Sequence, residues 1–216
     1  MAAMETTAVW QGGLVLAAYV LGCVNTGYYL VRLKTGRDIR AMGSGNAGAR
    51  NVGRVLGRSG FVLTLAGDLL KGAIAVILAK MLQGAPTTVV FACIAVVAGH
   101  LWPVQLGFRG GKGAATGCGV IFALEPVTAA ILLILCGLLR LVLRRSSLSA
   151  MIAFVAGPLV AFLLGRSLAV VAGFAGVAAL VVFSHLANLK SDIGGEAERA
   201  SDEGIRKDTS LPAGKP

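Results

Sequence analysis

Long apolar runs, separated by short polar segments, make up most of the chain. The runs cover residues 12–33, 55–82, 87–106, 114–143, 148–165 and 167–187. A helix that crosses a bilayer needs about 20 apolar residues, and most of these runs reach that length. The pattern therefore predicts an all-α, polytopic integral membrane protein.

Basic residues predict which polar segments face the cytoplasm, because short cytoplasmic loops carry an excess of Lys and Arg. The segment from Lys34 to Arg58 holds six basic residues and one acid, Asp38, so we expect it inside. The N-terminus then lies outside. Two further crossings bring Arg109 and Lys112 back to the cytoplasmic side.

The run 114–143 can be interpreted as one span or as two helices that turn at Glu125-Pro126. A turn returns the basic cluster 140–145 to the cytoplasm, and proline cannot continue a helical hydrogen-bond ladder. We therefore expect about seven transmembrane helices, with the N-terminus out and the C-terminus in. Lys80 and Arg166 are the exceptions to the charge rule under this topology.

The turn leaves a short fourth segment, Ala114–Leu124, which cannot cross a hydrocarbon layer of about 30 Å. Irregular backbone at membrane depth is stable only where protein surrounds it or where it lines a cavity. We therefore expect a helix N-terminus, with its unpaired N–H groups, inside the protein at the end of a glycine-rich loop.

Composition excludes several classes of protein. Hydrophobic residues make up 56% of the chain and charged residues 14%, with a mean hydropathy of +0.80 and a net charge of +10. These values exclude a soluble enzyme, a disordered chain and a disulfide scaffold. The basic residues lie in short loops, so we attribute them to topology and anionic headgroups and expect no nucleic-acid partner.

Residues 1–190 form one predicted membrane domain, and the charged tail, 191–216, is expected to be disordered. No basic region precedes the first apolar run, so we expect the first span to stay in the mature protein. The four cysteines lie in apolar segments without the spacing of a metal site, and we interpret them as buried small hydrophobic residues.

The first segment that carries chemistry is Gly43-Ser44-Gly45-Asn46-Ala47-Gly48-Ala49-Arg50-Asn51, followed by Arg54. Its glycines satisfy a dinucleotide-binding pattern, but that pattern requires a βαβ unit, which the sequence does not predict. The segment offers a flexible backbone with a hydroxyl, two amides and two guanidinium groups. This set suits a phosphate or a polyol, and an ordinary polar loop is the alternative.

The second segment runs from Gly99-His100 to Phe108-Arg109-Gly110-Gly111-Lys112-Gly113-Ala114-Ala115-Thr116. Its glycines bare the backbone around Lys112, where the short fourth segment begins. Free N–H groups, a helix N-terminus and a lysine together make an anion site. The spacing is not that of a nucleotide-binding P-loop, and close helix packing is the alternative role of the glycines.

The third segment is His185-Leu186-Ala187-Asn188, in which His185 and Asn188 share one helix face. A histidine there serves either as a catalyst or as an anchor at the membrane interface. Two histidines without nearby carboxylates do not make a metal site, so we expect no metal. Asp68 and Lys71, one turn apart in an apolar run, are expected to pair.

These three segments, in this order, resemble the motifs of the bacterial acyl-phosphate-dependent glycerol-3-phosphate acyltransferases, the PlsY type. The family motifs run approximately as GSGNxGxTN, GHxxPxxxxFxGGKGxAT and HxxN, on short cytoplasmic loops of a seven-helix protein. The second motif matches from Gly99 to Thr116 throughout, and the likeness covers roughly residues 12–198. The stretch Asp68–Gly72 also resembles the family.

The resemblance implies transfer of a fatty acyl group from acyl phosphate to the 1-hydroxyl of glycerol 3-phosphate. The product is lysophosphatidic acid, the first intermediate of phospholipid synthesis. No metal or cofactor is implied, and neither acyl-CoA nor acyl carrier protein is a direct donor. The expected location is the bacterial plasma membrane, with the active site facing the cytoplasm. Expected partners are both substrates, the lipid bilayer and, as a candidate, the enzyme that produces the acyl phosphate.

By position, the resemblance assigns catalytic roles to Ser44, Lys112, His185 and Asn188. It assigns substrate binding to a larger set, namely Asn46, Gly48, Asn51, Arg54, His100, Gly110, Gly111, Gly113 and Thr116. Neutralising two anionic substrates in one pocket would supply most of the catalysis through positioning and electrostatic stabilisation. The general base is either His185 or a phosphate of the substrate.

Three positions depart from the family pattern. Arg50 stands where the first motif has threonine, and Cys23-Val24-Asn25 stands where the family has Ser-Ile-Pro. Ser191 replaces an arginine found three residues after the third-motif asparagine. These changes bear on the acceptor and the rate more than on the reaction class, and they leave a divergent paralogue open.

Two other classes of function compete with an enzyme. A transporter or channel for small organic anions would also use interrupted segments and intramembrane charges, but it needs a path to both faces and favours an inverted repeat. The sequence shows no such repeat. A non-catalytic lipid-binding scaffold would not require the lysine within Gly110–Gly113.

Overall fold

The computed structural model describes residues 2–186, with side chains from Thr7 onward, and over this range it is helical with no strand. Its helices are α1 (Ala2–Cys23), α2 (Thr26–Thr35), α3 (Ala49–Met81), α4 (Pro86–Leu101), α5 (Ala114–Leu124), α6 (Pro126–Leu143) and α7 (Ser146–Leu163), followed by a helix described over Leu168–Leu186. Two 3₁₀ turns, η1 (Ile39–Ala41) and η2 (Val104–Leu106), lie in the loops. The all-α prediction is confirmed.

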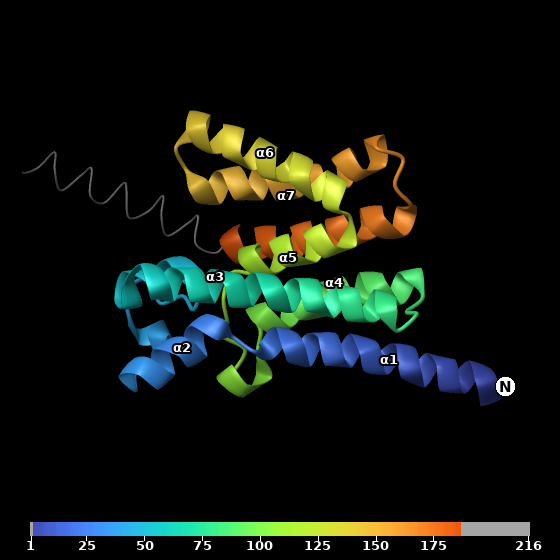
Figure 1. Ribbon diagram of the computed structural model, residues 1–216, viewed down its shortest axis with the longest axis horizontal. Coiled ribbons are helices and arrows are strands. Elements are labelled where there is room, and N and C mark those ends of the chain that lie inside the picture. The colour runs from blue at the N-terminus through green and yellow to red at the C-terminus, as the bar shows by residue number, and fades with distance from the viewer. Residues whose placement is uncertain (1, 187–216) are drawn as a thin grey trace, which may run out of the picture.

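Six of the apolar helical stretches in the described range are long enough to cross a membrane, and α5, with 11 residues, is shorter. The chain runs back and forth along the bundle, so the N-terminus and the end of the Leu168–Leu186 helix lie at opposite ends (Figure 1). The turn predicted at Glu125-Pro126 is confirmed, because α5 ends at Leu124 and α6 begins at Pro126. The orientation of the bundle in the membrane stays a prediction.

The first apolar run is interrupted, which corrects the expectation of one continuous helix. α1 ends at Cys23, and α2 begins at Thr26. Between them the fully buried Asn25 donates from Nδ2 to the His100 carbonyl oxygen at 3.2 Å. Gln105 Nε2 donates to the carbonyl of Cys23 at 2.7 Å. A buried amide needs a hydrogen-bond partner, and here the last turn of α4 and the chain just beyond it supply the partners on the two sides of the break.

α3 begins at Ala49, before the apolar run that the sequence predicts from residue 55. It is interrupted at Gly57, whose φ of 73° and ψ of −164° are not helical. Glycine adopts a positive φ without the steric cost that a Cβ brings. The break separates a short first segment, which carries Arg50 and Arg54, from the long apolar segment of the bundle.

Glycines let the central helices approach one another closely. A Cβ on Gly119 of α5 would overlap the Leu69 carbonyl of α3, and a Cβ on Gly72 of α3 would overlap the Thr116 carbonyl of α5. α1 and α4 approach each other in the same way. Lipid tails are as apolar as the helices, so close packing of this kind is a main source of stability in a membrane.

Two apolar clusters are buried. The larger one lies where α3, α4, α5 and the Leu168–Leu186 helix meet, and fully buried valines at 76, 96, 120, 177 and 181 belong to it. The smaller one lies beneath the loop between α2 and α3 and consists of Val31, Ile39, Ala47 and Val52. This smaller cluster supports the first motif segment.

Charged side chains provide hydrogen-bond and ion-pair partners at the C-terminal end of α5. Lys80 Nζ donates to the carbonyls of Ala123 and Leu124, both at 2.7 Å. Glu125 accepts from the Thr128 backbone N–H at 2.6 Å and pairs with Arg166 at 3.2 Å. Lys80 and Arg166, the two exceptions to the charge rule, therefore have structural partners where a short helix ends.

The α3–α5 contact yields a test of the packing. Gly119→Leu is expected to lower the free energy of unfolding by about 1–3 kcal/mol, because the new side chain would overlap the backbone of α3. Gly137→Leu, on α6 where a Cβ meets nothing within 4 Å, is the matched control. The measurement is the thermal unfolding midpoint in detergent, and equal midpoints for the two variants would contradict the close packing.

Candidate active site

Asn51, in the first turn of α3, organises the loop that precedes the helix. Its Oδ1 accepts from the Ser44 backbone N–H at 2.9 Å, and its Nδ2 donates to the carbonyls of Met42 (2.8 Å) and Asn46 (2.9 Å). Gly43, with φ 55°, leaves room for this amide, because a Cβ there would overlap Oδ1. Asn51 is only 2% exposed, and its side-chain amide makes its hydrogen bonds within the loop. It therefore supports the loop, whereas we had expected it to contact a substrate.

The same loop presents polar groups at its surface. Ser44 is exposed, and the half-buried Asn46 accepts from the Gly48 N–H at 2.7 Å, just before α3 begins. Arg54 lies one turn beyond Arg50, on the same exposed face of α3. The first motif thus arranges a hydroxyl and two guanidinium groups around a helix N-terminus.

The glycine-rich loop before α5 folds back on the end of α4. That helix stops at Leu101, short of the predicted residue 106, because Pro103 disfavours a helical residue before it. Gly110 N–H donates to the Leu101 carbonyl at 2.9 Å, and Gly111 N–H donates to the His100 carbonyl at 3.1 Å. These two N–H groups are paired within the protein, which corrects the expectation that they face an anion.

Lys112 and Gly113 complete the loop where α5 begins. Gly113 precedes the first turn with φ 77° and is packed against Leu101. The first N–H groups of a helix lack intrahelical partners, so α5 directs them at this loop. Thr116, by contrast, is fully buried in the helix packing, and its contact with a substrate stays a prediction.

His100 lies beneath the glycine-rich loop and is 2% exposed. A Cβ on Gly111 would overlap the Nε2 atom of its ring. On the other side of the ring, Nδ1 lies 2.7 Å from Lys71 Nζ, which pairs with Asp68 Oδ1 at 2.8 Å. The predicted Asp68–Lys71 pair is confirmed, and it extends to His100.

His185 is held at the end of the Leu168–Leu186 helix. Its Nδ1 lies 2.8 Å from the Val181 carbonyl. A carbonyl only accepts, so Nδ1 carries the proton and Nε2 keeps its lone pair, as a general base requires. The neighbouring Ser184 hydroxyl donates to the Lys112 carbonyl at 2.7 Å, which fixes the third motif segment to the second.

Arg50 and Lys112 bring positive charge to the His185 ring from two other elements. The Arg50 guanidinium also donates from Nη1 to Ser147 Oγ, at the start of α7, at 3.3 Å. The structure therefore brings the three motif segments together, and the residue that departs from the family motif stands among them. The resulting site is cationic, with one basic histidine nitrogen and a helix N-terminus.

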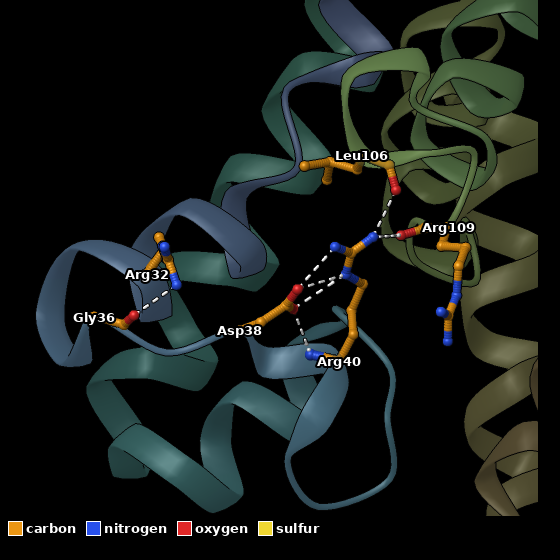
Figure 2. A network of polar contacts seen from close by, with 6 residues as sticks. All are labelled: Arg32, Gly36, Asp38, Arg40, Leu106 and Arg109. Carbon is orange, nitrogen blue, oxygen red and sulfur yellow. Dashed lines mark hydrogen bonds and ion pairs between the residues drawn. The ribbon is translucent and has the colours of Figure 1, made fainter.

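Arg40, which no motif in the sequence marks, joins the first two motif loops (Figure 2). Its Nη1 donates to the carbonyls of Leu106 at 2.6 Å and Arg109 at 3.3 Å. Its Nη2 pairs with Asp38 Oδ2 at 2.7 Å, and the guanidinium lies 5.1 Å from the centre of the Tyr28 ring. We call this set of contacts the Arg40 clamp.

Hydrogen bonding to Arg40 holds the pKa of Asp38 below its ordinary value, although partial burial acts in the opposite direction. A carboxylate with a lowered pKa contributes stability that is fully present above its ordinary pKa and is lost only as the pH falls through the lowered one. The Arg40 clamp therefore keeps its charge pair throughout the neutral range.

An apolar groove lies between α5, α6 and α7. Cys118, Cys136 and Ala150 stand among its ten lining residues, and it holds about 380 Å³ of empty space, open side included. Cys118 is four residues into α5 from Ala114, so the groove starts about 6 Å from the end of the glycine-rich loop. Along α6 it extends from Cys136 to Ala129, about 10 Å.

The structure leaves the expectations about metal binding and about the C-terminal residues as predictions. The described residues hold no group of three or more His, Cys, Asp or Glu side chains that could bind a metal ion. Asn188, Ser191 and the tail 191–216 lie outside the described residues, so their roles stay predictions.

Residues 13–195 match the family model described as glycerol-3-phosphate acyltransferase. The chain belongs to this family. Glycerol-3-phosphate acyltransferase 1 of Desulfitobacterium hafniense is 41% identical over 86% of this chain and 92% of its own length. The glycerol-3-phosphate acyltransferase of Rubrobacter xylanophilus is 42% identical over 82% of this chain and 89% of its own length.

Two solved structures of similar proteins support the same family assignment. The crystal structure of PlsY, an integral membrane glycerol 3-phosphate acyltransferase, in its glycerol 3-phosphate form superposes with a TM-score of 0.79 at 36% identity. The match covers 86% of this chain and 92% of that one. The lysophosphatidic acid form gives a TM-score of 0.76 at 34% identity, with the same coverage.

The Arg40 clamp can be tested in this acyltransferase. Arg40→Lys keeps the charge but cannot reach Asp38 and two carbonyls together, so we expect kcat/KM to fall about 10-fold. Arg37→Lys, at an exposed position in the same loop, is the matched control and should change it less than about twofold. If both variants had the parent's kcat/KM, the clamp would have no part in activity.

Proposed function

We propose that this protein transfers an acyl group from acyl phosphate to the 1-hydroxyl of glycerol 3-phosphate, at the cytoplasmic face of the bacterial plasma membrane. Family membership supports glycerol 3-phosphate as the acceptor, and a PlsY structure in a lysophosphatidic acid form supports that product. The observation that carries the proposal is the hydrogen bond from Ser184 to the Lys112 carbonyl, which holds the His185 segment against the start of α5, whose helix lines an apolar groove.

In the proposed reaction, the O1 oxygen of glycerol 3-phosphate attacks the acyl carbonyl carbon. An ester C–O bond forms, and the bond from that carbon to the phosphate oxygen breaks, so inorganic phosphate leaves with the bonding electron pair. The hydroxyl proton goes to His185 Nε2 or to a phosphate oxygen. Both substrates are anionic, and the cationic groups offset their mutual repulsion while they are held together.

Some of the site residues are proposed to contact the substrates, and others support the loops that carry them. We assign Lys112 and the first N–H groups of α5 to one phosphate, and Ser44, Asn46, Arg50 and Arg54 to the other polar groups of the substrates. Gly48 is the N-cap of α3, whose first turns carry Arg50 and Arg54, and Ser44 and Asn46 lie in the loop just before it. The residues that hold the two loops in position are Asn51, His100, Gly110, Gly111 and Gly113. We keep for Asn188 the catalytic role that the resemblance assigns to it.

The apolar groove suits the acyl chain of the donor. Its lining residues carry no charged side chain, and it begins about one helical turn beyond the anion-binding end of α5. An acyl phosphate can therefore place its phosphate near Lys112 and its first methylene groups between α5, α6 and α7. A longer chain continues through the open side of the groove into the bilayer, which costs no exposure of methylene groups to water.

The excess of basic residues in the loops supports the orientation of the bundle. The first two motif segments, with Arg50, Arg54, Arg109 and Lys112, lie in loops that we place on the cytoplasmic side. Water-soluble glycerol 3-phosphate would reach the site from there. The enzyme that produces the acyl phosphate is a candidate partner at the same face, since its product partitions into the bilayer.

Lys112→Ala is expected to lower kcat about 100-fold or more, because it removes a cation from the charge that develops on phosphate and carbonyl oxygens. The assay follows lysophosphatidic acid formed from palmitoyl phosphate and labelled glycerol 3-phosphate by detergent-purified protein. Palmitoyl-CoA is supplied in parallel, and we expect no product from it.

Lys112→Arg, which keeps the charge, is the matched variant and should retain more activity than Lys112→Ala. The thermal unfolding midpoint of each variant is measured to show that both are folded. Normal turnover in folded Lys112→Ala would overturn the role of Lys112, and product from palmitoyl-CoA alone would overturn acyl phosphate as the donor.

Ala150→Phe tests the groove. Ala150 is half-buried in the groove, and a phenyl ring there is expected to raise KM for palmitoyl phosphate about 10-fold while KM for glycerol 3-phosphate stays unchanged. Val155→Phe, at a position of α7 that is 60% exposed, is the control and should change neither. An equal rise in both KM values for Ala150→Phe would argue against an acyl groove.

A further inference from the structure

Lys71 is buried inside the bundle with three partners. Its Nζ donates to the Val24 carbonyl and to His100 Nδ1, each at 2.7 Å, and it pairs with Asp68 Oδ1 at 2.8 Å. An ammonium group has three N–H donors and no acceptor, so these partners account for all of it. Val24 lies at the break between α1 and α2, and His100 near the end of α4, so one ammonium joins three elements.

The contact with Lys71 decides which nitrogen of His100 carries the proton. Lys71 can only donate, so Nδ1 has to accept, and the proton of the neutral ring is on Nε2. A second proton on the ring would add a positive charge next to Lys71, where among the described residues Asp68 is the one carboxylate at hand. Burying such an unbalanced charge is costly, and His100 therefore stays neutral.

The Nε2 corner of the ring faces the glycine-rich loop. A Cβ on Gly111 would overlap Nε2, so only glycine lets the backbone lie against the ring. The loop is also tied to the His100 residue itself, because Gly111 N–H donates to the His100 carbonyl. Asn25 Nδ2 donates to the same carbonyl at 3.2 Å from the α1–α2 break. The position of the loop therefore depends on the position of His100.

We propose that Lys71, balanced by Asp68, is a positioning residue that locks His100 in the Nε2–H tautomer and so holds the Gly110–Gly111 turn where Lys112 and α5 bind the substrate anion. The proposal deepens the proposed function, on which its kinetic part rests. It gives the two histidines opposite tautomers, since His185 carries its proton on Nδ1 and His100 carries it on Nε2.

The first test is the ¹⁵N NMR spectrum of detergent-solubilised protein labelled at histidine. The chain contains only two histidines, and His185→Gln assigns their signals. We expect His100 to remain neutral with its proton on Nε2 between about pH 6 and 8, the range in which an ordinary histidine titrates. A proton on Nδ1, or a doubly protonated ring in this range, would overturn the lock. This spectrum needs no turnover, so it is separate from the test of acyl transfer.

The second test removes both charges with Asp68→Asn combined with Lys71→Met, which avoids leaving one buried charge alone. We expect His100 to show both tautomers and KM for palmitoyl phosphate, whose phosphate we place near Lys112, to rise about 10-fold, with a smaller change in KM for glycerol 3-phosphate. Lys80→Met, at the far end of the same helix, is the control and should leave the His100 signals as they are. If the double variant kept the parent's tautomer and the parent's KM, Lys71 would not be a positioning residue.

Discussion

The structure depends on one constraint, which is that α5 is too short for the membrane it sits in. Eleven residues rise about 16 Å, roughly half of a hydrocarbon layer, so the helix cannot reach both surfaces and at least one of its ends needs hydrogen-bond partners from the protein. At its C-terminal end, Lys80 donates to a backbone carbonyl of the helix, and the Glu125–Arg166 ion pair lies next to it. At its N-terminal end the glycine-rich loop lies against the helix. The N–H groups that have no intrahelical partner there can bind an anionic substrate.

Carboxylates in the described part of the chain neutralise cations that belong to the framework. Asp38 pairs with Arg40, which joins two loops, and Asp68 pairs with Lys71, which supports His100. Arg50, by contrast, contacts a serine hydroxyl on α7 and acts on His185. A chain with few acids thus uses them to hold basic side chains in fixed positions, and it keeps positive charge where the motif segments come together.

The sequence predicted those features that depend on neighbouring residues. Apolar runs predicted where the membrane helices lie, although α1 begins ten residues and α3 six residues before the predicted run. Proline predicted the turn before α6, and spacing within one helix predicted the Asp68–Lys71 pair. Features that depend on distant residues were missed. Asn25 interrupts the first helix for a carbonyl 75 residues away, and Arg40 reaches one 66 residues away. The pairing of the Gly110 and Gly111 N–H groups was missed for a related reason, since it depends on how the loop folds back on α4.

The Arg40 clamp makes the two substrate loops thermodynamically dependent on each other. Its guanidinium holds carbonyls of the chain between η2 and α5 and is itself held by the residues that lead into the loop before α3. A ligand that orders either loop therefore lowers the entropy that the other still has to lose. Linkage is reciprocal, so any rise in affinity that one bound substrate gives the other would be returned by the same factor.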